Sequence, residues 1–216
     1  MAKPILYSYF RSSCSWRVRI ALNLKEIDYE YRPIHLLKNG GEQHSDEYMA
    51  LNPSRTVPLL RIDDHNLAQS LAIIEYLDET RPNPALLPRD NAYNRAVVRR
   101  ISDMIASDIQ PIQNLRVLSY VGDEKKMEWG RHWIDAGFQS LEALLKETSG
   151  AYCVGDQITM ADICLIPQIA NAKRFKVDLS KFPVICRIDE TLSTHKAFQA
   201  AHPFRQPDCP DDLRIK

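Results

Sequence analysis

The spacing of apolar residues over the first eighty positions alternates between strand and helix patterns. Residues 5–10, Ile-Leu-Tyr-Ser-Tyr-Phe, form a continuous apolar and aromatic run that is typical of a buried strand. Residues 16–24 carry apolar side chains too densely for a surface loop, so they predict a helix. Residues 29–34 predict a second strand, which a right-handed crossover would place parallel to the first.

The next fifty residues continue this alternation. The pattern predicts a helix at 45–51 and a strand at 59–62 that begins after Pro58, a position where strands tolerate proline. A turn at Asp63-Asp64 leads to a short edge strand, and Ser70 is predicted to cap the following helix. The predicted order of elements is therefore β-α-β-α-β-β-α.

The strand pattern ends at a proline-rich stretch, residues 81–88, which is unable to continue a helix. Beyond it, the apolar residues of 97–115 and 129–145 keep helical spacing. We therefore predict a first domain over residues 1–83, a linker over 84–90 and an all-helical domain over 91–216.

One helix of the second domain begins at a capping box. Thr159 and Asp162 have the spacing of this motif, with Ile158 and Ile163 placed as a hydrophobic staple. The helix is apolar nearly all round, so we expect it to be buried on every side, and Pro167 is expected to kink it.

The balance of charges and the short apolar runs argue against nucleic acids and membranes as partners. The chain has 216 residues with 28 Lys+Arg against 28 Asp+Glu, so it has no charge bias toward nucleic acid or anionic membranes. Its apolar runs are far shorter than the ~18 residues of a spanning helix, and Arg11 interrupts the apolar start too early for a secretory signal. We expect no nucleic-acid partner, no membrane association and a cytosolic location.

Glycine, cysteine and histidine spacing excludes several cofactors. The 7 glycines form no G-x-G-x-x-G or P-loop motif for a dinucleotide or a nucleoside triphosphate. The 5 cysteines contain no C-x-x-C pair and the 6 histidines no H-E-x-x-H, so we expect no metal site. An odd number of cysteines suits a reducing compartment.

The residues that suggest chemistry lie between the first strand and the first helix, in the segment Arg11-Ser12-Ser13-Cys14-Ser15-Trp16-Arg17. A helix N-terminus stabilises an anion through its free N–H groups and its partial positive charge. It could lower the pKa of a thiol from ~8.5 by about two units.

Three groups could use this site. Cys14 could be a nucleophile. Activation of Ser12 as a nucleophile needs an adjacent general base, and neither His35 nor His44 lies within the motif, so we assign Ser12 as a hydrogen-bond donor. The third group is the thiol of an external molecule.

The first domain resembles the thioredoxin fold of the cytosolic glutathione transferases, with serine where a thioredoxin carries its redox cysteine. Residues 12–22, Ser-Ser-Cys-Ser-Trp-Arg-Val-Arg-Ile-Ala-Leu, resemble the signature of the zeta class, whose members are maleylacetoacetate isomerases. Four shorter pieces also resemble that class: Val57-Pro58, Gln69-Ser70, Ile109-Gln110-Pro111 with Asn114, and Ala172-Lys173-Arg174-Phe175. The implied fold class is an α/β thioredoxin-like N-terminal domain followed by an all-α C-terminal domain.

The resemblance implies a glutathione-dependent cis–trans isomerisation of maleylacetoacetate to fumarylacetoacetate, a step of tyrosine and phenylalanine breakdown. Glutathione would be a returned cofactor, whose thiolate adds to the conjugated double bond and leaves after rotation. A secondary transferase activity on α-halo acids such as dichloroacetate, and a homodimer, are implied as well.

The resemblance also implies roles for individual residues. Ser12 would donate to the glutathione sulfur and Cys14 would line the reacting centre. The backbone of Val57, before a cis Pro58, would pair with the cysteinyl part of glutathione. The remaining residues implied for glutathione binding are Ser13, Ser15, Trp16, Arg17, Gln43, Gln69, Ser70, Gln110, Asn114, Leu115 and Arg116.

The substrate of this reaction is a dianion, for which Arg11 and Arg174 are the candidate carboxylate-binding residues, with Arg174 preferred. Gln110 and Asn114, four residues apart, are predicted to share one helix face toward an interdomain cleft, with Pro111 bending the helix between them. Arg116 departs from the serine of relatives at this place and adds a positive charge.

Other interpretations of these residues remain open. The serines could be simple helix caps, Cys14 an inert buried thiol, and Arg174 the partner of a nearby acid. Cys153, Cys164 and Cys186 are predicted to lie in the core and Cys209 to be an exposed thiol. A rival enzyme would be a thiol transferase or dehydroascorbate reductase using Cys14, and a rival of another class a non-catalytic module for protein contacts.

Overall fold

The computed structural model describes residues 2–215. Contacts divide them into two compact units, residues 2–84 with 196–215 and residues 85–195, and we treat each unit by itself. The sequence prediction assigned residues 196–216 to the helical domain. In the structure these residues belong to the first unit instead, because their side chains pack and form hydrogen bonds within it.

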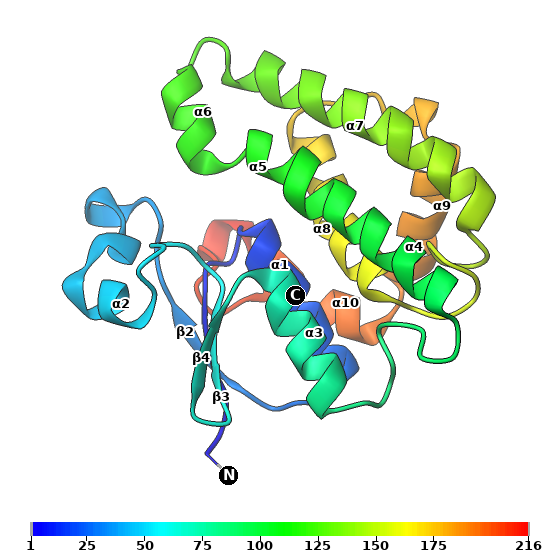
Figure 1. The fold of residues 1–216 in the computed structure, drawn as a ribbon. Coiled ribbons are helices and arrows are strands. Elements are labelled where there is room, and N and C mark those ends of the chain that lie inside the picture. Colours follow the sequence, from blue (N-terminus) through cyan, green and yellow to red (C-terminus); the bar gives the residue numbers. More distant parts are fainter. Residues whose placement is uncertain (1, 216) are drawn as a thin grey trace. The chain divides into compact units, whose positions relative to one another are not determined.

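The first unit is built on a four-stranded sheet (Figure 1). Its strands are β1 (Ile5–Ser8), β2 (Glu30–Pro33), β3 (Leu59–Ile62) and β4 (His65–Ala68), in the spatial order β2-β1-β3-β4. β1 and β2 are parallel, as the crossover predicted, while β3 is antiparallel to both β1 and β4. The predicted edge strand is therefore β4.

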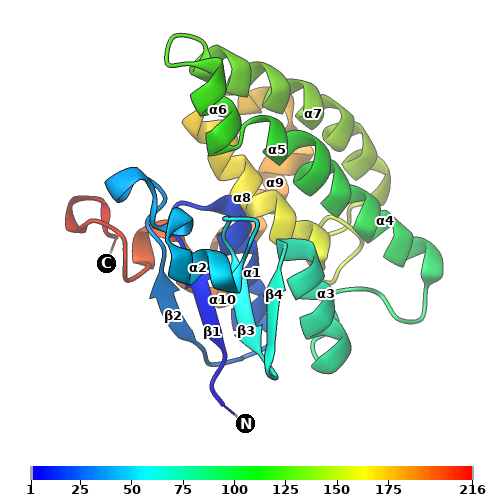
Figure 2. The ribbon, with the colours of Figure 1, turned by 60° about the vertical axis from the view of Figure 1, so that its left-hand side comes forward.

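Three helices alternate with these strands in the predicted order: α1 (Ser13–Leu24), α2 (Asp46–Leu51) and α3 (Ser70–Thr80). α1 and α3 pack against each other. Two short 3-10 turns, η1 (Lys38–Gly40) and η2 (Glu42–His44), precede α2 and were not predicted. Figure 1 shows α2 on the other side of the strands from the α1 and α3 pair, and Figure 2 shows α2 in front of the strands.

The turn from β3 to β4 explains its two aspartates. Asp63 and Asp64 have φ values of 49° and 63°, the left-handed pair that a tight two-residue hairpin requires. Asp63 also accepts two hydrogen bonds from Arg81, at 2.6 and 2.7 Å, and one from the Tyr76 hydroxyl at 2.8 Å. These bonds hold the pKa of Asp63 down at about 2.

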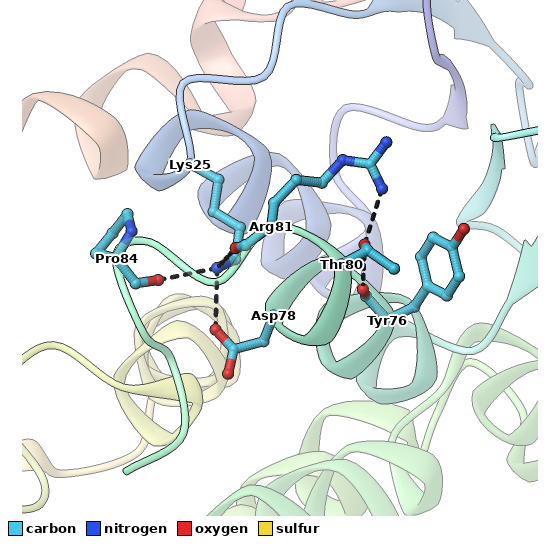
Figure 3. Close-up of polar contacts among 6 residues, drawn as sticks. All are labelled: Lys25, Tyr76, Asp78, Thr80, Arg81 and Pro84. Atoms are coloured by element: carbon cyan, nitrogen blue, oxygen red, sulfur yellow. Dashed lines mark hydrogen bonds and ion pairs between the residues drawn. The ribbon is translucent and has the colours of Figure 1, made fainter. Parts of the chain in front are cut away.

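The end of α3 is fixed by a buried lysine (Figure 3). Lys25, at the C-terminal end of α1, donates to the Asp78 carboxylate at 2.9 Å and to the carbonyls of Arg81 and Pro84 at 2.6 and 2.8 Å. Its side chain is 0% exposed. One ammonium group therefore satisfies the carbonyls where α3 ends.

The C-terminal elements of the first unit are α10 (Lys196–Ala200), η5 (Pro203–Arg205) and η6 (Asp211–Leu213). α10 packs on α1. Cys209 lies in a buried cluster with Tyr7, Tyr9 and Phe10, and only 3% of it is exposed. The prediction of an exposed thiol at Cys209 is therefore wrong, because the chain returns to the sheet after α10.

The second unit is helical throughout, apart from one isolated bridge between Ser149 and Gly155. This confirms the predicted all-α character for residues 85–195. Its α-helices are α4 (Ala92–Asp103), α5 (Gln110–Ile112), α6 (Leu115–Val121), α7 (Lys126–Thr148), α8 (Met160–Arg174) and α9 (Pro183–Ser193). A π-helical turn, η3 (Met104–Ile109), separates α4 from α5, and a 3-10 turn, η4 (Leu179–Lys181), precedes α9.

α8 begins at the predicted capping box. Thr159 and Asp162 satisfy each other's backbone N–H groups, and Asp162 also accepts from the N–H of Cys153 at 2.9 Å. Burial raises the pKa of Asp162. Most of the α8 side chains are buried, as predicted, and Cys153 and Cys164 lie in the core, while Cys186 is only partly buried.

Within residues 2–215, the helices are too short or too polar to cross a bilayer. The same residues contain no cluster of three or more His, Cys, Asp or Glu side chains arranged to hold a metal ion.

Candidate active site

Ser12 caps the helix that follows the first strand. Its backbone is extended, with φ −69° and ψ 116°, and its Oγ accepts a hydrogen bond from the N–H of Ser15 at 3.2 Å. The cap uses the oxygen of the hydroxyl, so the hydroxyl proton remains able to donate to another group. The N–H groups of Ser13 and Cys14, in the first turn of α1, have no acceptor within the helix.

Buried polar atoms without a protein partner concentrate just after this cap. Among residues 2–215, six buried side-chain nitrogen and oxygen atoms lack a hydrogen bond, and four of them belong to Ser15, Trp16 and Arg17. Such groups normally find a partner, so their grouping is typical of a site that a ligand or ordered water completes. This arrangement fits a polar, anionic ligand.

Arg17 connects the N-terminal ends of two helices. It is 1% exposed, and its Nη1 donates to Ser70 Oγ at 3.2 Å and lies 4.0 Å from Cys14 Sγ. Ser70 is the first residue of α3. A buried guanidinium therefore adds its charge to the partial positive charges of α1 and α3.

Ser70 is not the helix cap that its sequence pattern predicted. Gln69 occupies that position, with φ 71° and no side-chain hydrogen bond to the helix. The hydroxyl of Ser70 is engaged by Arg17, 53 residues away in the chain. The spacing of residues along the sequence does not predict the contact between Arg17 and Ser70, because this contact depends on how α1 and α3 pack.

Two further residues of the first unit that the resemblance implies for glutathione binding, Val57 and Gln43, lie outside its strands and α-helices. Val57 is 8% exposed and precedes Pro58 across a cis peptide bond, which confirms that prediction. Gln43 lies in η2, and its Nε2 donates to the carbonyl of Leu36 at 3.5 Å. Its Oε1 is buried and has no partner among the described residues.

Models of known families match parts of both units of the chain. Residues 11–80 match the model of the glutathione S-transferase N-terminal domain, and residues 114–195 match that of the C-terminal domain. The maleylacetoacetate isomerase of Rattus norvegicus is 60% identical over 212 residues, covering 98% of both chains.

Two solved structures are similar over nearly the whole chain. The holo structure of a maleylpyruvate isomerase, a bacterial glutathione S-transferase in the zeta class, has a TM-score of 0.91 and 43% identity, covering 95% of this chain and 100% of that one. This chain belongs to the zeta class of the glutathione S-transferase family. The maleylacetoacetate isomerase of Anaeromyxobacter dehalogenans 2CP-1, solved with glutathione in its active site, has a TM-score of 0.87 and 43% identity, covering 96% of this chain and 98% of that one.

The zeta-class residues of the second unit do not share the helix face that the sequence predicted. Gln110 begins α5, which ends at Ile112, and Asn114 is the cap of α6, where its Oδ1 accepts from the N–H of Arg116 at 3.3 Å. Pro111 is followed by a break in the helix instead of a bend. The two residues are therefore in different helices, and the prediction of one common face is wrong.

The remaining zeta-class positions of the second unit are partly or fully exposed. Leu115 is 39% exposed, Arg116 is exposed, and Arg174, at the C-terminal end of α8, places its guanidinium carbon 5.4 Å from the centre of the Phe175 ring. Gln110 is the exception, with 8% exposed. In the first unit, Arg11 is exposed beside Ser12.

Proposed function

We propose that this protein catalyses the glutathione-dependent cis–trans isomerisation of maleylacetoacetate to fumarylacetoacetate. The observation that carries the proposal is the cap of α1, where the Ser12 hydroxyl keeps its proton at a helix N-terminus. The 60% identity to the rat isomerase, which extends over nearly all of both chains, supports the same activity.

Glutathione is the cofactor in this proposal, and it fits the polar groups of the first unit. The N–H groups of Ser13 and Cys14 and the side chains of Ser12, Ser15, Trp16 and Arg17 would hold its cysteinyl part, together with the backbone of Val57. Gln69 and Ser70 would hold its γ-glutamyl carboxylate at the N-terminus of α3, and Gln43 its glycyl end. The sequence resemblance adds Gln110, Asn114, Leu115 and Arg116 to this set.

When bound, glutathione supplies a thiolate nucleophile that converts the substrate's double bond into a rotatable single bond and is then released. The protein's contribution is electrostatic. The Ser12 hydroxyl donates to the sulfur, and the free N–H groups of α1 favour its ionised form. Arg17 adds a positive charge that, within the described residues, is not paired with an acid.

The substrate carries two carboxylates, and we propose Arg11 and Arg174 as the residues that bind them. Arginine suits this role because its planar guanidinium binds a carboxylate through two parallel hydrogen bonds. Arg174 remains the preferred residue, with its exposed guanidinium beside the Phe175 ring.

The finer parts of the proposal are a place in tyrosine and phenylalanine breakdown, a secondary activity on α-halo acids such as dichloroacetate, and a cytosolic homodimer. A thiolate that displaces halide explains the second activity with the same residues. Sedimentation at micromolar concentration is expected to show a dimer, and a monomer alone would contradict that part.

Loss of maleylacetone, a stable substrate analogue, tests the activity directly. We expect isomerisation with glutathione and none above the uncatalysed rate without it. S-methylglutathione, which lacks the thiol, is the matched control and should not support turnover. An enzyme that leaves maleylacetone unchanged in the presence of glutathione would refute the proposal.

A second candidate function follows from Cys14. Cys14 is partly exposed, and its sulfur lies 4.0 Å from Arg17 Nη1. It could form a mixed disulfide with glutathione, as in a thiol transferase or dehydroascorbate reductase. The two functions differ in the essential residue: Ser12→Ala should reduce isomerisation about 100-fold, whereas Cys14→Ala should abolish only the thiol transfer.

A further inference from the structure

The backbone turn before Ser12 is held by a buried arginine. The N–H of Ser12 donates to the carbonyl of Tyr9 at 3.0 Å, which closes a turn over residues 9–12. Arg19 of α1 is 0% exposed, and its guanidinium donates to the carbonyls of Tyr9 and Phe10 at 3.4 and 3.0 Å. The carbonyl side of the turn is therefore fixed from within α1.

The N–H side of the same turn is held by the C-terminal segment of the chain. The N–H of Phe10 donates to Asp208 Oδ2 at 2.9 Å, across 198 residues of sequence. The hydroxyl of Tyr31, in β2, donates to Asp208 Oδ1 at 2.6 Å. Both backbone groups of Phe10 are thus engaged, one by Arg19 and the other by Asp208.

Further contacts connect the same segment to α1. Arg19 Nε donates to the carbonyl of Ala201 at 3.0 Å, and the rings of Trp16 and His202 meet edge to face with centroids 5.3 Å apart. Phe10 and Cys209 are buried in one cluster, 2% and 3% exposed. Figure 1 shows the C-terminal segment, in red, close to the start of α1, where these contacts lie. Through these contacts, residues 201–209 pack against the Ser12 turn and the first turns of α1.

We propose that Asp208 and Arg19 are positioning residues for Ser12, and that through Phe10 they set the direction in which the Ser12 hydroxyl donates. The inference rests on the proposed function, because it assumes that this hydroxyl contacts the glutathione sulfur. Neither residue is among those proposed to bind glutathione or the substrate. A displacement of about 1 Å in the donor is enough to weaken a hydrogen bond that depends on alignment.

A purely structural role for Asp208 would give a different result. Anchoring of the chain end would lower the melting temperature of a variant and leave the chemistry of bound glutathione unchanged. Positioning instead predicts a change in the ionisation of the bound thiol with little change in affinity for an analogue that has no thiol. The test therefore measures both.

The experiment compares Asp208→Ala with Asp212→Ala in the full-length protein. Asp212 is exposed in the same segment, in η6, so its variant removes an equal charge without touching the Ser12 turn. Ultraviolet absorbance of the thiolate gives the pKa of bound glutathione, and calorimetry gives the affinity for S-methylglutathione. We expect Asp208→Ala to raise that pKa by about one unit, about tenfold less thiolate at a pH well below it. Affinity for S-methylglutathione should change less than about threefold, and Asp212→Ala should match the wild type in both.

The outcomes separate this inference from the proposed function. A wild-type protein that does not lower the pKa of bound glutathione refutes the proposed function and the inference together. A wild type that lowers it, with an Asp208→Ala variant that lowers it equally, refutes the inference alone. If Asp208→Ala does not fold, Asp208→Asn and Tyr31→Phe decide by the same titration: a raised pKa supports the inference and an unchanged one overturns it.

Discussion

Single residues in the first unit combine structural and electrostatic roles, and Asp63 is a clear case. Its left-handed backbone closes the β3–β4 turn, while its carboxylate binds Arg81 and Tyr76 of α3. The Arg81 guanidinium is the main reason for its lowered pKa of about 2. Asp63 therefore stabilises the fold only in its ionised form.

This predicts a pH dependence for the Asp63→Asn variant. A carboxyl whose folded pKa lies below its unfolded value of about 3.9 contributes stability above that value and loses it as the pH falls toward 2. We expect the variant to be less stable than the wild type by roughly 1 kcal/mol at pH 7, since the pair is partly exposed. The difference should shrink between pH 5 and pH 2.

Urea unfolding at several pH values checks this, with Asp64→Asn as the control. Asp64 has a similar left-handed backbone at the same turn, and it is exposed. A difference between Asp63→Asn and the wild type that stays constant down to pH 2 would contradict the assignment.

At the scale of elements, the ends of α3 depend on residues of α1. Arg17 donates to the first residue of α3, and Lys25 donates to the carbonyl of Arg81, the C-cap that follows α3 (Figure 3). The spacing of apolar residues predicted both helices and the parallel pairing of β1 with β2. It did not predict Gln69 as the cap of α3, because Ser70 is engaged by Arg17, which is distant in sequence. It also did not predict the break between Gln110 and Asn114, which follows a π-helical turn.

Loss of the Lys25 ammonium is expected to be costly. Lys25→Met should destabilise the fold by about 3–5 kcal/mol, because it removes a buried ammonium that donates to the Asp78 carboxylate and to two carbonyls. The double variant Lys25→Met with Asp78→Leu should recover only part of this loss, since the carbonyls stay unpaired.

Denaturant unfolding measures these changes in the free energy of unfolding. Lys126→Met is the matched control, because Lys126 pairs with Asp123 at an exposed position and should change stability by less than about 1 kcal/mol. Equal losses for Lys25→Met and Lys126→Met would contradict the importance of burial here.

At the scale of the whole molecule, the first unit is discontinuous in sequence, because residues 196–215 return to it after the helical unit. The spacing of apolar residues predicts helices and strands but not which unit a helix packs against. The predicted helical domain therefore included residues 196–216. The candidate residues that the sequence placed in the first unit, from Ser12 to Ser70, all lie in one compact unit. Glutathione should therefore stabilise that unit by binding its folded form.

Glutathione at about 100 times its dissociation constant is expected to add about 2.7 kcal/mol to the stability of the folded state. For a protein of 216 residues that corresponds to an increase in melting temperature of roughly 5–10 °C. Differential scanning fluorimetry measures it. The dipeptide Cys-Gly, which lacks the γ-glutamyl carboxylate assigned to Ser70, is the control and should raise the melting temperature less; an equal increase would contradict that assignment.

The central claim is that the Ser12 hydroxyl at the N-terminus of α1 holds the sulfur of glutathione in its ionised form. Ultraviolet titration of bound glutathione in the wild type and in Ser12→Ala tests it most directly. We predict a bound thiol pKa about two units below the ~8.5 of an ordinary thiol in the wild type, and a return of at least one unit toward it in Ser12→Ala. The same lowered pKa in both proteins would contradict the claim.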